Sequence, residues 1–147
     1  MAIALRAAYW AMHRRTNALL APHGVTADQF VLLARLAQED GITQQELARR
    51  ASTDANTIRP MLLLLQKRGL IERRSRASDR RALSVLLTSA GRRKFHIMLK
   101  ATEACREQML AAITHGAPRA LSHNLQHLAH ALQTPPARPP GPRPRSR

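Results

Sequence analysis

A short helix followed by a tight polar turn and a second helix is the feature that most restricts the fold of this sequence. Thr43 and Glu46 form a capping box at the start of the first of these helices. The pair Thr53 and Asp54 provides a cap for the second helix, which ends before Gly69. Two helices joined by so short a turn indicate a helix-turn-helix.

Two further helices are expected before this pair. From residue 2 to about residue 21, apolar residues recur with the helical period until Pro22 ends the run. The next helix begins at Thr26, which forms a second capping box with Gln29, and it extends to about Gln38.

After the helix-turn-helix the period changes from that of a helix to that of a strand. Residues 70–74 and 82–87 predict two strands around the polar loop 75–81, which together make a hairpin. Thr88 caps a long helix expected from about 89 to 114, and a last helix runs from Pro118 to near residue 133. The predicted fold class is mainly α with a small β-hairpin wing, a winged helix-turn-helix flanked by N- and C-terminal helices.

The charge balance predicts a polyanionic partner. Lys and Arg number 24 against 9 Asp and Glu, for a formal net charge of +15, while 44% of the residues are hydrophobic. A basic chain that keeps this apolar fraction folds, and nucleic acid is the first polyanion to consider, with an anionic membrane surface second. Residues 134–147, rich in Pro and Arg, are expected to form a disordered basic tail.

The location expected for the chain is cytoplasmic. No run of 18 apolar residues predicts a transmembrane helix, and the N-terminal segment does not have the order of a signal peptide. The single cysteine, Cys105, fits a reducing compartment.

The second helix of the helix-turn-helix is expected to contact DNA bases through Asn56, Thr57 and Arg59. Four apolar residues at spacings of three and four would face the core and leave these three on the opposite face: Ile58, Met61, Leu62 and Leu65. Asn can address adenine, Arg can address guanine, and Thr can contact a phosphate or a methyl group. The alternative is that Asn56 and Thr57 only cap the helix.

The hairpin is expected to bind DNA through its arginines. Five of the nine residues from 73 to 81 are arginine: Arg73, Arg74, Arg76, Arg80 and Arg81. An outward guanidinium on a two-stranded ribbon fits the narrow, negative minor groove. Asp79 would hold the loop and orient an arginine. The alternative is a solvated charge run on a surface turn.

These residues resemble the MarR family of bacterial regulators. The wing pattern Asp-x-Arg-x-x-x-Val-x-Leu-Thr from Asp79 to Thr88, followed by Ala90-Gly91-Arg92, is similar to the wing signature of that family. The similarity extends to residues 45–48 and to Leu65-x-x-x-Gly69-Leu70-Ile71. The resemblance covers residues 1–133.

The resemblance implies a homodimeric repressor of transcription that binds a pseudo-palindromic operator in double-stranded DNA. It implies a reading head at about 26–88 and dimerisation helices at about 2–21 and 89–133. Arg81 would be the minor-groove or backbone contact. A small aromatic or phenolic effector would bind between the dimer helices and the reading head, where Trp10, His13 and Phe30 are candidates to line the pocket.

Three residues depart from the family pattern. Pro60 falls inside the predicted recognition helix, where it would kink the helix unless the helix starts later. Leu63 and Leu64 occupy positions that are usually polar or basic in the family. Fewer base contacts are therefore expected from this helix, with a larger share from the wing.

No enzyme, cofactor or metal site is predicted, because the sequence has no phosphate-binding loop and no nucleophile with a recognisable flank. Three histidines share a face of the last helix, His123, His127 and His130, but nothing nearby completes a zinc site. Cys105 is interpreted as a buried apolar side chain in preference to an oxidant sensor. Two other functions stay open: a low-specificity architectural DNA-binding protein, and a membrane-surface protein that binds through its basic tail.

Overall fold

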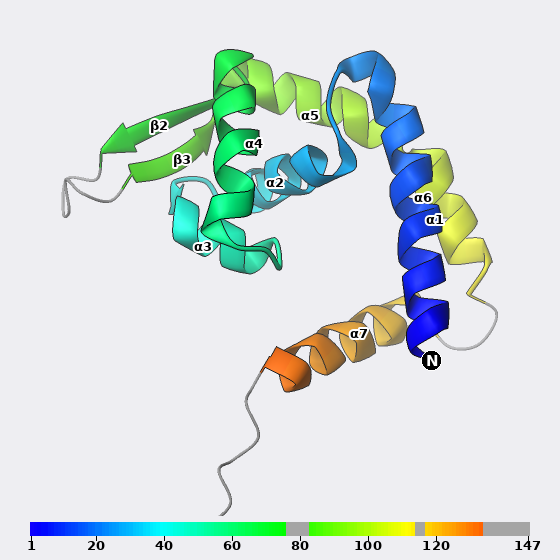
Figure 1. Ribbon diagram of the computed structural model, residues 1–147. Helices are drawn as coiled ribbons and strands as arrows, with labels where there is room; N and C mark the ends of the chain where they lie inside the picture. The colour runs from blue at the N-terminus through cyan, green and yellow to red at the C-terminus, as the bar shows by residue number, and fades with distance from the viewer. Residues whose placement is uncertain (76–82, 114–116, 134–147) are drawn as a thin grey trace, which may run out of the picture. The chain divides into compact units, whose positions relative to one another are not determined.

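The computed structural model describes residues 1–75, 83–113 and 117–133. They fall into two compact units, residues 1–107 and the described residues beyond 107. The first unit contains α1 (Ala2–Leu20), η1 (Ala21–His23), α2 (Ala27–Gln38), β1 (Ile42–Thr43), α3 (Gln44–Arg50), α4 (Ala55–Lys67), β2 (Ile71–Ser75), β3 (Leu83–Leu87) and α5 (Ser89–Ala101) (Figure 1). Helix α6 (Glu103–Ala111) crosses the boundary between the units, and α7 (Pro118–Gln133) lies in the second.

The predicted helix starts are confirmed at α2, α4 and α5. Both hydrogen bonds of the Thr26 capping box are present, and Asp54 accepts the backbone N–H groups of Asn56 and Thr57, each at 2.9 Å. Thr88 accepts the N–H of Gly91 at 2.9 Å. Local capping therefore sets where each of these helices begins.

The capping box expected at α3 is only half formed. Thr43 Oγ1 accepts the N–H of Glu46 at 3.2 Å, as predicted. The carboxylate of Glu46 binds Arg49 and Arg50 instead of the backbone of Thr43. Two arginines one turn away compete successfully for the carboxylate because charge-assisted hydrogen bonds are stronger than a bond to a neutral N–H.

The hairpin is confirmed, and it belongs to a three-stranded antiparallel sheet with the order β1-β3-β2. Ile71 pairs with Leu87 and Arg73 pairs with Val85, so β2 and β3 are in register along their length. Strand β1, which adds Ile42 opposite Val85, was not predicted. Two residues are too few to show the alternation by which a strand is recognised in a sequence.

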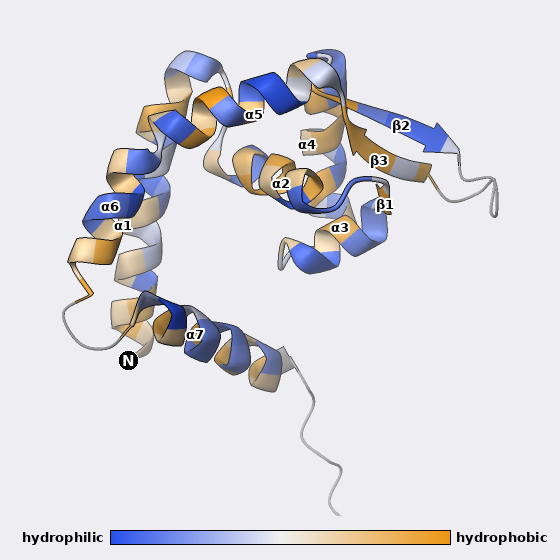
Figure 2. Cartoon of the chain, turned by 180° about the vertical axis from the view of Figure 1, so that it is seen from behind, coloured by the Kyte–Doolittle hydropathy of each residue, from blue (hydrophilic) through white to orange (hydrophobic). Residues whose placement is uncertain are grey.

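The core of the first unit lies between α2, α4, the sheet and α5. Its fully buried side chains include Leu32, Leu33 and Leu36 from α2, Ile58, Leu62 and Leu65 from α4, Val85 from β3 and Met98 from α5. The buried stripe predicted for α4 is confirmed, with Met61 partly buried at its edge. Figure 2 shows the apolar residues of α2 and β3 along this core.

The first turn of α5 is packed against Leu70, which lies between the end of α4 and the start of β2. The backbone oxygen of Leu70 accepts the N–H of Thr88 at 3.1 Å, and the hydroxyl of Thr88 donates to the oxygen of Gly69 at 2.6 Å. A Cβ on Gly91 would lie 1.9 Å from the oxygen of Leu70. Only a glycine allows this approach, so the contact fixes α5 relative to the helix-turn-helix.

Asp40, in the loop between α2 and β1, binds both the last residue of β3 and the first turn of α5. One carboxylate oxygen of Asp40 accepts the N–H of Leu87 at 2.9 Å, and the other forms an ion pair with Arg92. Asp40 therefore connects the base of the hairpin to the first turn of α5.

The single long helix predicted from 89 to 114 is wrong, because it is divided into α5 and α6 at Thr102. The hydroxyl of Thr102 donates to the carbonyl oxygens of Met98 and Leu99, each at 3.0 Å. Such a bond back to the preceding turn bends helices, and here it coincides with the interruption.

Helix α7 starts at Pro118 and ends at Gln133, as predicted. Residues 134–147, expected to form the basic tail, lie outside the described residues.

Candidate DNA-binding surface

Helix α4 presents the three predicted base-contacting residues at its surface. Asn56, Thr57 and Arg59 are all exposed, while Ile58 between them is fully buried. The helix begins at Ala55 and continues through Pro60, so the later start considered for it does not occur. Pro60 lacks the N–H that would otherwise donate to the carbonyl oxygen of Asn56. Because Pro60 is on the exposed side of the helix, water can donate to this oxygen instead.

Thr57 is partly committed to the cap of its own helix. Its hydroxyl donates to the second carboxylate oxygen of Asp54 at 2.6 Å, and this bond is the main reason why the pKa of Asp54 is lowered. Asp54 is the N-cap residue, whereas the side chains of Asn56 and Arg59 make no hydrogen bond or ion pair with any described residue. The alternative that Asn56 caps the helix is therefore not what the structure shows.

Helix α3 is held against its neighbours by a chain of charged pairs. Glu46 binds Arg49 and Arg50, and Arg50 also binds Glu39 at the end of α2. Hydrogen bonds from Arg49, which has the larger effect, and from Arg50 lower the pKa of Glu46 to about 2. At the other side of α3, the amide of Gln44 donates to the oxygen of Ala55 at 3.2 Å, which joins α3 to the start of α4.

The described part of the hairpin contributes Arg73 and Arg74. Arg74 forms an ion pair of 2.6 Å with Glu72. Arg73 lies two residues from the buried Ile71 and pairs with Val85, and its Nε and Nη2 atoms are buried without a hydrogen-bond partner among the described residues. The outward orientation expected for the hairpin arginines is therefore wrong for Arg73, because it shares the inner face of the sheet with Ile71. Four further residues predicted for this site lie outside the described residues: Arg76, Asp79, Arg80 and Arg81.

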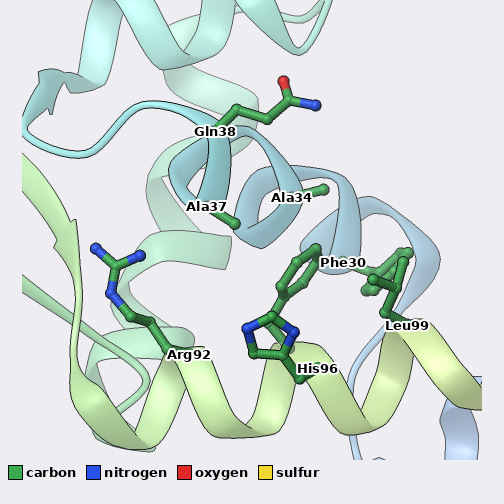
Figure 3. A pocket seen from close by; sticks show the side chains of 8 residues that line it. Phe30, Ala34, Ala37, Gln38, Arg92, His96 and Leu99 are labelled. Carbon is green, nitrogen blue, oxygen red and sulfur yellow. The ribbon is translucent and has the colours of Figure 1, made fainter.

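A cavity of about 420 Å³ opens between α2 and α5. Its wall consists of Phe30, Ala34, Ala37 and Gln38 from α2 and of Arg92, Phe95, His96 and Leu99 from α5. Figure 3 shows Arg92 and His96 projecting from α5 toward α2, with the ring of Phe30 next to His96. The rings of Phe30 and Phe95 are stacked with their centres 5.5 Å apart, so the floor of this cavity is aromatic.

Among the three candidates for an effector pocket, Phe30 lines this cavity. Trp10 and His13 lie on α1, where their rings make an edge contact at 5.7 Å, and neither is part of the cavity wall. Trp10 is 43% exposed, and His13 binds Asp28 and Asn17 at 3.3 and 3.1 Å. The sequence did not predict that residues of α5 line this cavity. The small residues Ala34 and Ala37, three apart on one helix, were the available indication of space.

The remaining candidates of the sequence are Cys105 and the histidines of α7. Cys105 is buried in α6. The rings of His123 and His127 stack at 6.5 Å on α7. Within residues 1–75, 83–113 and 117–133, no group of three metal-ligating side chains comes together, and no helix is long and apolar enough to cross a membrane.

Comparisons with known proteins point to one family. Residues 25–83 match the profile of the MarR family. The HTH-type transcriptional regulator TtmR of Methylorubrum extorquens is 34% identical over 92 residues, which are 63% of this chain and 47% of TtmR. The HTH-type transcriptional repressor Rv2887 of Mycobacterium tuberculosis is 31% identical over 115 residues, which are 76% of this chain and 81% of Rv2887.

A solved structure extends the similarity to the whole fold. The transcriptional repressor CouR of Rhodococcus jostii, bound to a 23-mer DNA duplex, superposes with a TM-score of 0.74 at 25% identity. The superposition covers 91% of this chain and 92% of CouR. The arrangement of α3, α4 and the hairpin described above is therefore one that occurs in a protein bound to DNA.

Proposed function

This chain belongs to the MarR family of transcription regulators, and from that membership we propose that it is a sequence-specific repressor that binds an operator in double-stranded DNA as a homodimer. The observation that supports this proposal is the outward face of α4. It is exposed, it includes Asn56 and Arg59, and the sequence of the helix from Ala55 to Lys67 contains no acidic residue that would repel DNA.

The roles proposed for the parts of the chain follow from its fold. Residues 26–88 form the reading head, in which α4 enters the major groove and the wing contacts the minor groove or the backbone. In the wing, Arg81 is the principal contact, Arg76 and Arg80 add charge, and Asp79 orients Arg81. With a formal net charge of +15, phosphate contacts would give most of the affinity. Such a protein works where its operator is, in the cytoplasm.

Exposed apolar side chains on the flanking helices support the homodimer. They are Ile3, Leu5, Tyr9, Trp10 and Met12 on α1, Ile97 and Leu99 on α5, Met109 and Leu110 on α6, and Leu121, Leu125 and Leu132 on α7. Apolar surface on this scale is unfavourable in water and marks an interaction site. A second copy of the chain would cover it, and two-fold symmetry would then match a pseudo-palindromic operator.

The cavity between α2 and α5 supports a small effector as the signal for release. Its volume of about 420 Å³ and its stacked phenylalanines suit one aromatic or phenolic molecule. Arg92 in its wall also binds Asp40, which accepts the N–H of Leu87 at the base of the hairpin. An effector that displaces Arg92 would therefore act on the wing.

The test begins with DNA fragments selected from a random pool by the purified full-length protein. Fluorescence anisotropy at fixed salt then compares the selected operator with a random duplex of equal length. A difference of at least a thousandfold is expected for a sequence-specific repressor. A ratio near one would refute specificity and favour the architectural alternative.

Two substitutions distinguish the roles of α4 and the wing. Arg59→Ala is expected to cost about 1–3 kcal/mol on the operator and to relax the preference at one base pair of each half-site. Arg81→Ala is expected to weaken binding strongly while the dimer persists in analytical ultracentrifugation. Arg35→Ala is the control, because Arg35 is exposed on α2 and hydrogen bonds to Gln38 of the same helix.

The effector is tested separately with a panel of phenolic acids added to the protein–operator complex. Ala34→Leu fills the cavity and should leave operator binding intact while preventing release. If this variant leaves the operator at the same acid concentration as the wild-type protein, the effector binds outside this cavity.

A further inference from the structure

The most outward stripe of α4 contains an exposed leucine and a proline between two polar residues. Residues 56, 60, 63 and 67 are four, three and four positions apart, so they lie on one side of the helix, opposite the buried Ile58, Leu62 and Leu65. The stripe reads Asn56, Pro60, Leu63, Lys67, and all four residues are exposed. Leu63 is 53% exposed and Leu64, beside the stripe, is 39% exposed.

A single exposed leucine is ordinary on a protein surface, but Leu63 lies on the face of α4 that is proposed to enter the major groove. Asn56 and Leu63 are seven residues apart, which is about 10 Å along the helix or roughly three base-pair steps. If Asn56 contacts a base edge, Leu63 lies over a base of the same half-site. The Lys67 ammonium at the far end of the stripe can bind the phosphate that follows.

The chemistry of the major groove then limits what Leu63 can contact. A leucine has no donor or acceptor, and covering a base edge that offers only hydrogen-bonding groups would leave those groups without a partner. The C5-methyl group of thymine is the apolar feature that the major groove presents. Pro60, one turn before Leu63, adds a second apolar surface with no N–H.

We propose that Leu63 is a specificity-determining residue that packs on the C5-methyl group of one thymine in each operator half-site. This inference rests on the proposed function, because it requires α4 to enter the major groove. It also changes the expectation from the sequence that leucines at 63 and 64 only reduce the number of base contacts. Leu63 selects a thymine by contact with its methyl group.

The experiment replaces each thymine of the selected operator, one symmetric pair at a time, by deoxyuridine. This change removes the methyl group and leaves base pairing intact. Burial of one methyl group corresponds to about a fourfold change in affinity, so removal from both half-sites should weaken binding roughly sixteenfold at one pair of positions. The Leu63→Ala variant should bind the thymine and deoxyuridine operators equally at that pair, and Leu63→Met should restore part of the difference.

Leu64→Ala is the matched control, because it removes an identical side chain next to the stripe on the same helix. Thermal melting of both variants checks that they fold, as expected for exposed helical positions where Ala is a good helix former. The proposal is overturned if no thymine pair is sensitive, if Leu63→Ala keeps the full difference, or if Leu64→Ala abolishes it. Failure of the proposed function would be seen earlier, as a selection that yields no preferred sequence.

Discussion

Replacement of Gly91 by alanine tests the contact that fixes α5 on the helix-turn-helix. Helix propensity alone favours the change, because alanine is better than glycine inside a helix by about 1 kcal/mol. The structure predicts the opposite sign. The new Cβ would lie 1.9 Å from the backbone oxygen of Leu70 and 2.9 Å from its carbonyl carbon. Backbone atoms cannot rotate away, so α5 or the Leu70 peptide must move.

The size of the effect follows from what this movement disturbs. Overpacking of a buried site costs about 1–3 kcal/mol, and the upper end applies where the obstacle is backbone. The displaced oxygen also accepts the N–H of Thr88 at 3.1 Å, a bond worth about 1 kcal/mol. With the gain in propensity subtracted, Gly91→Ala should lower the free energy of unfolding by about 3 kcal/mol. For a chain of this size the melting temperature should fall by about 10 °C.

Calorimetry or circular dichroism melts of the full chain measure this shift at constant protein concentration, since dimerisation would make the melting temperature concentration-dependent. Ala90→Gly is the control, because Ala90 is exposed in the same turn and the change is the reverse one. It should cost only the propensity difference of about 1 kcal/mol. A melting temperature of Gly91→Ala at or above the wild-type value would refute the close approach of α5 to Leu70.

Substitutions at three further positions test the polar contacts around the reading head. In urea denaturation, Asp40→Ala should be less stable than Asp40→Asn by about 1–2 kcal/mol, because only Asn keeps an acceptor for the N–H of Leu87 while both lose the ion pair with Arg92. Glu46 has a pKa lowered to about 2, so its contribution to stability is complete above about pH 4.5 and is lost as the pH falls toward 2. The melting temperatures of wild type and Glu46→Gln should therefore converge over that range, and a constant gap would contradict the ion pairs. Thr88→Val should cost about 1–2 kcal/mol in thermal melts and Thr88→Ser much less, because serine keeps both hydroxyl bonds.

The helix boundaries could be predicted from the sequence because caps act locally. A hydroxyl or carboxylate such as Thr26, Asp54 or Thr88 binds N–H groups two or three residues ahead, and this geometry depends on nothing distant. The break at Thr102 is also local, but threonine in a helix usually leaves the helix intact. The sequence alone therefore predicted one continuous helix. Strand β1 depends on pairing with β3, more than forty residues away, and has no local pattern.

The candidate site was predictable in its exposed part and not in its enclosed part. Asn56 and Arg59 followed from helical periodicity, since the buried stripe of α4 determines which residues face outward. The cavity is formed by two helices that are far apart in the sequence, and the role of Arg92 in its wall depends on where Asp40 lies. Periodicity gives no information on such a pairing.

The wing motif indicates the family but not the operator, and the structure gives the reason. Val85 and Leu87 are buried, Thr88 caps α5, and Gly91 permits the contact with Leu70, so these members of the motif have structural roles. They hold the hairpin, α4 and α5 together, which any protein with this fold requires. The outward stripe of α4 lies outside the motif and is not part of the core, so its residues can change without cost to the fold. Similarity to other regulators therefore supports DNA binding, whereas the choice of operator sequence is proposed to depend on Asn56, Arg59 and Leu63 of this chain.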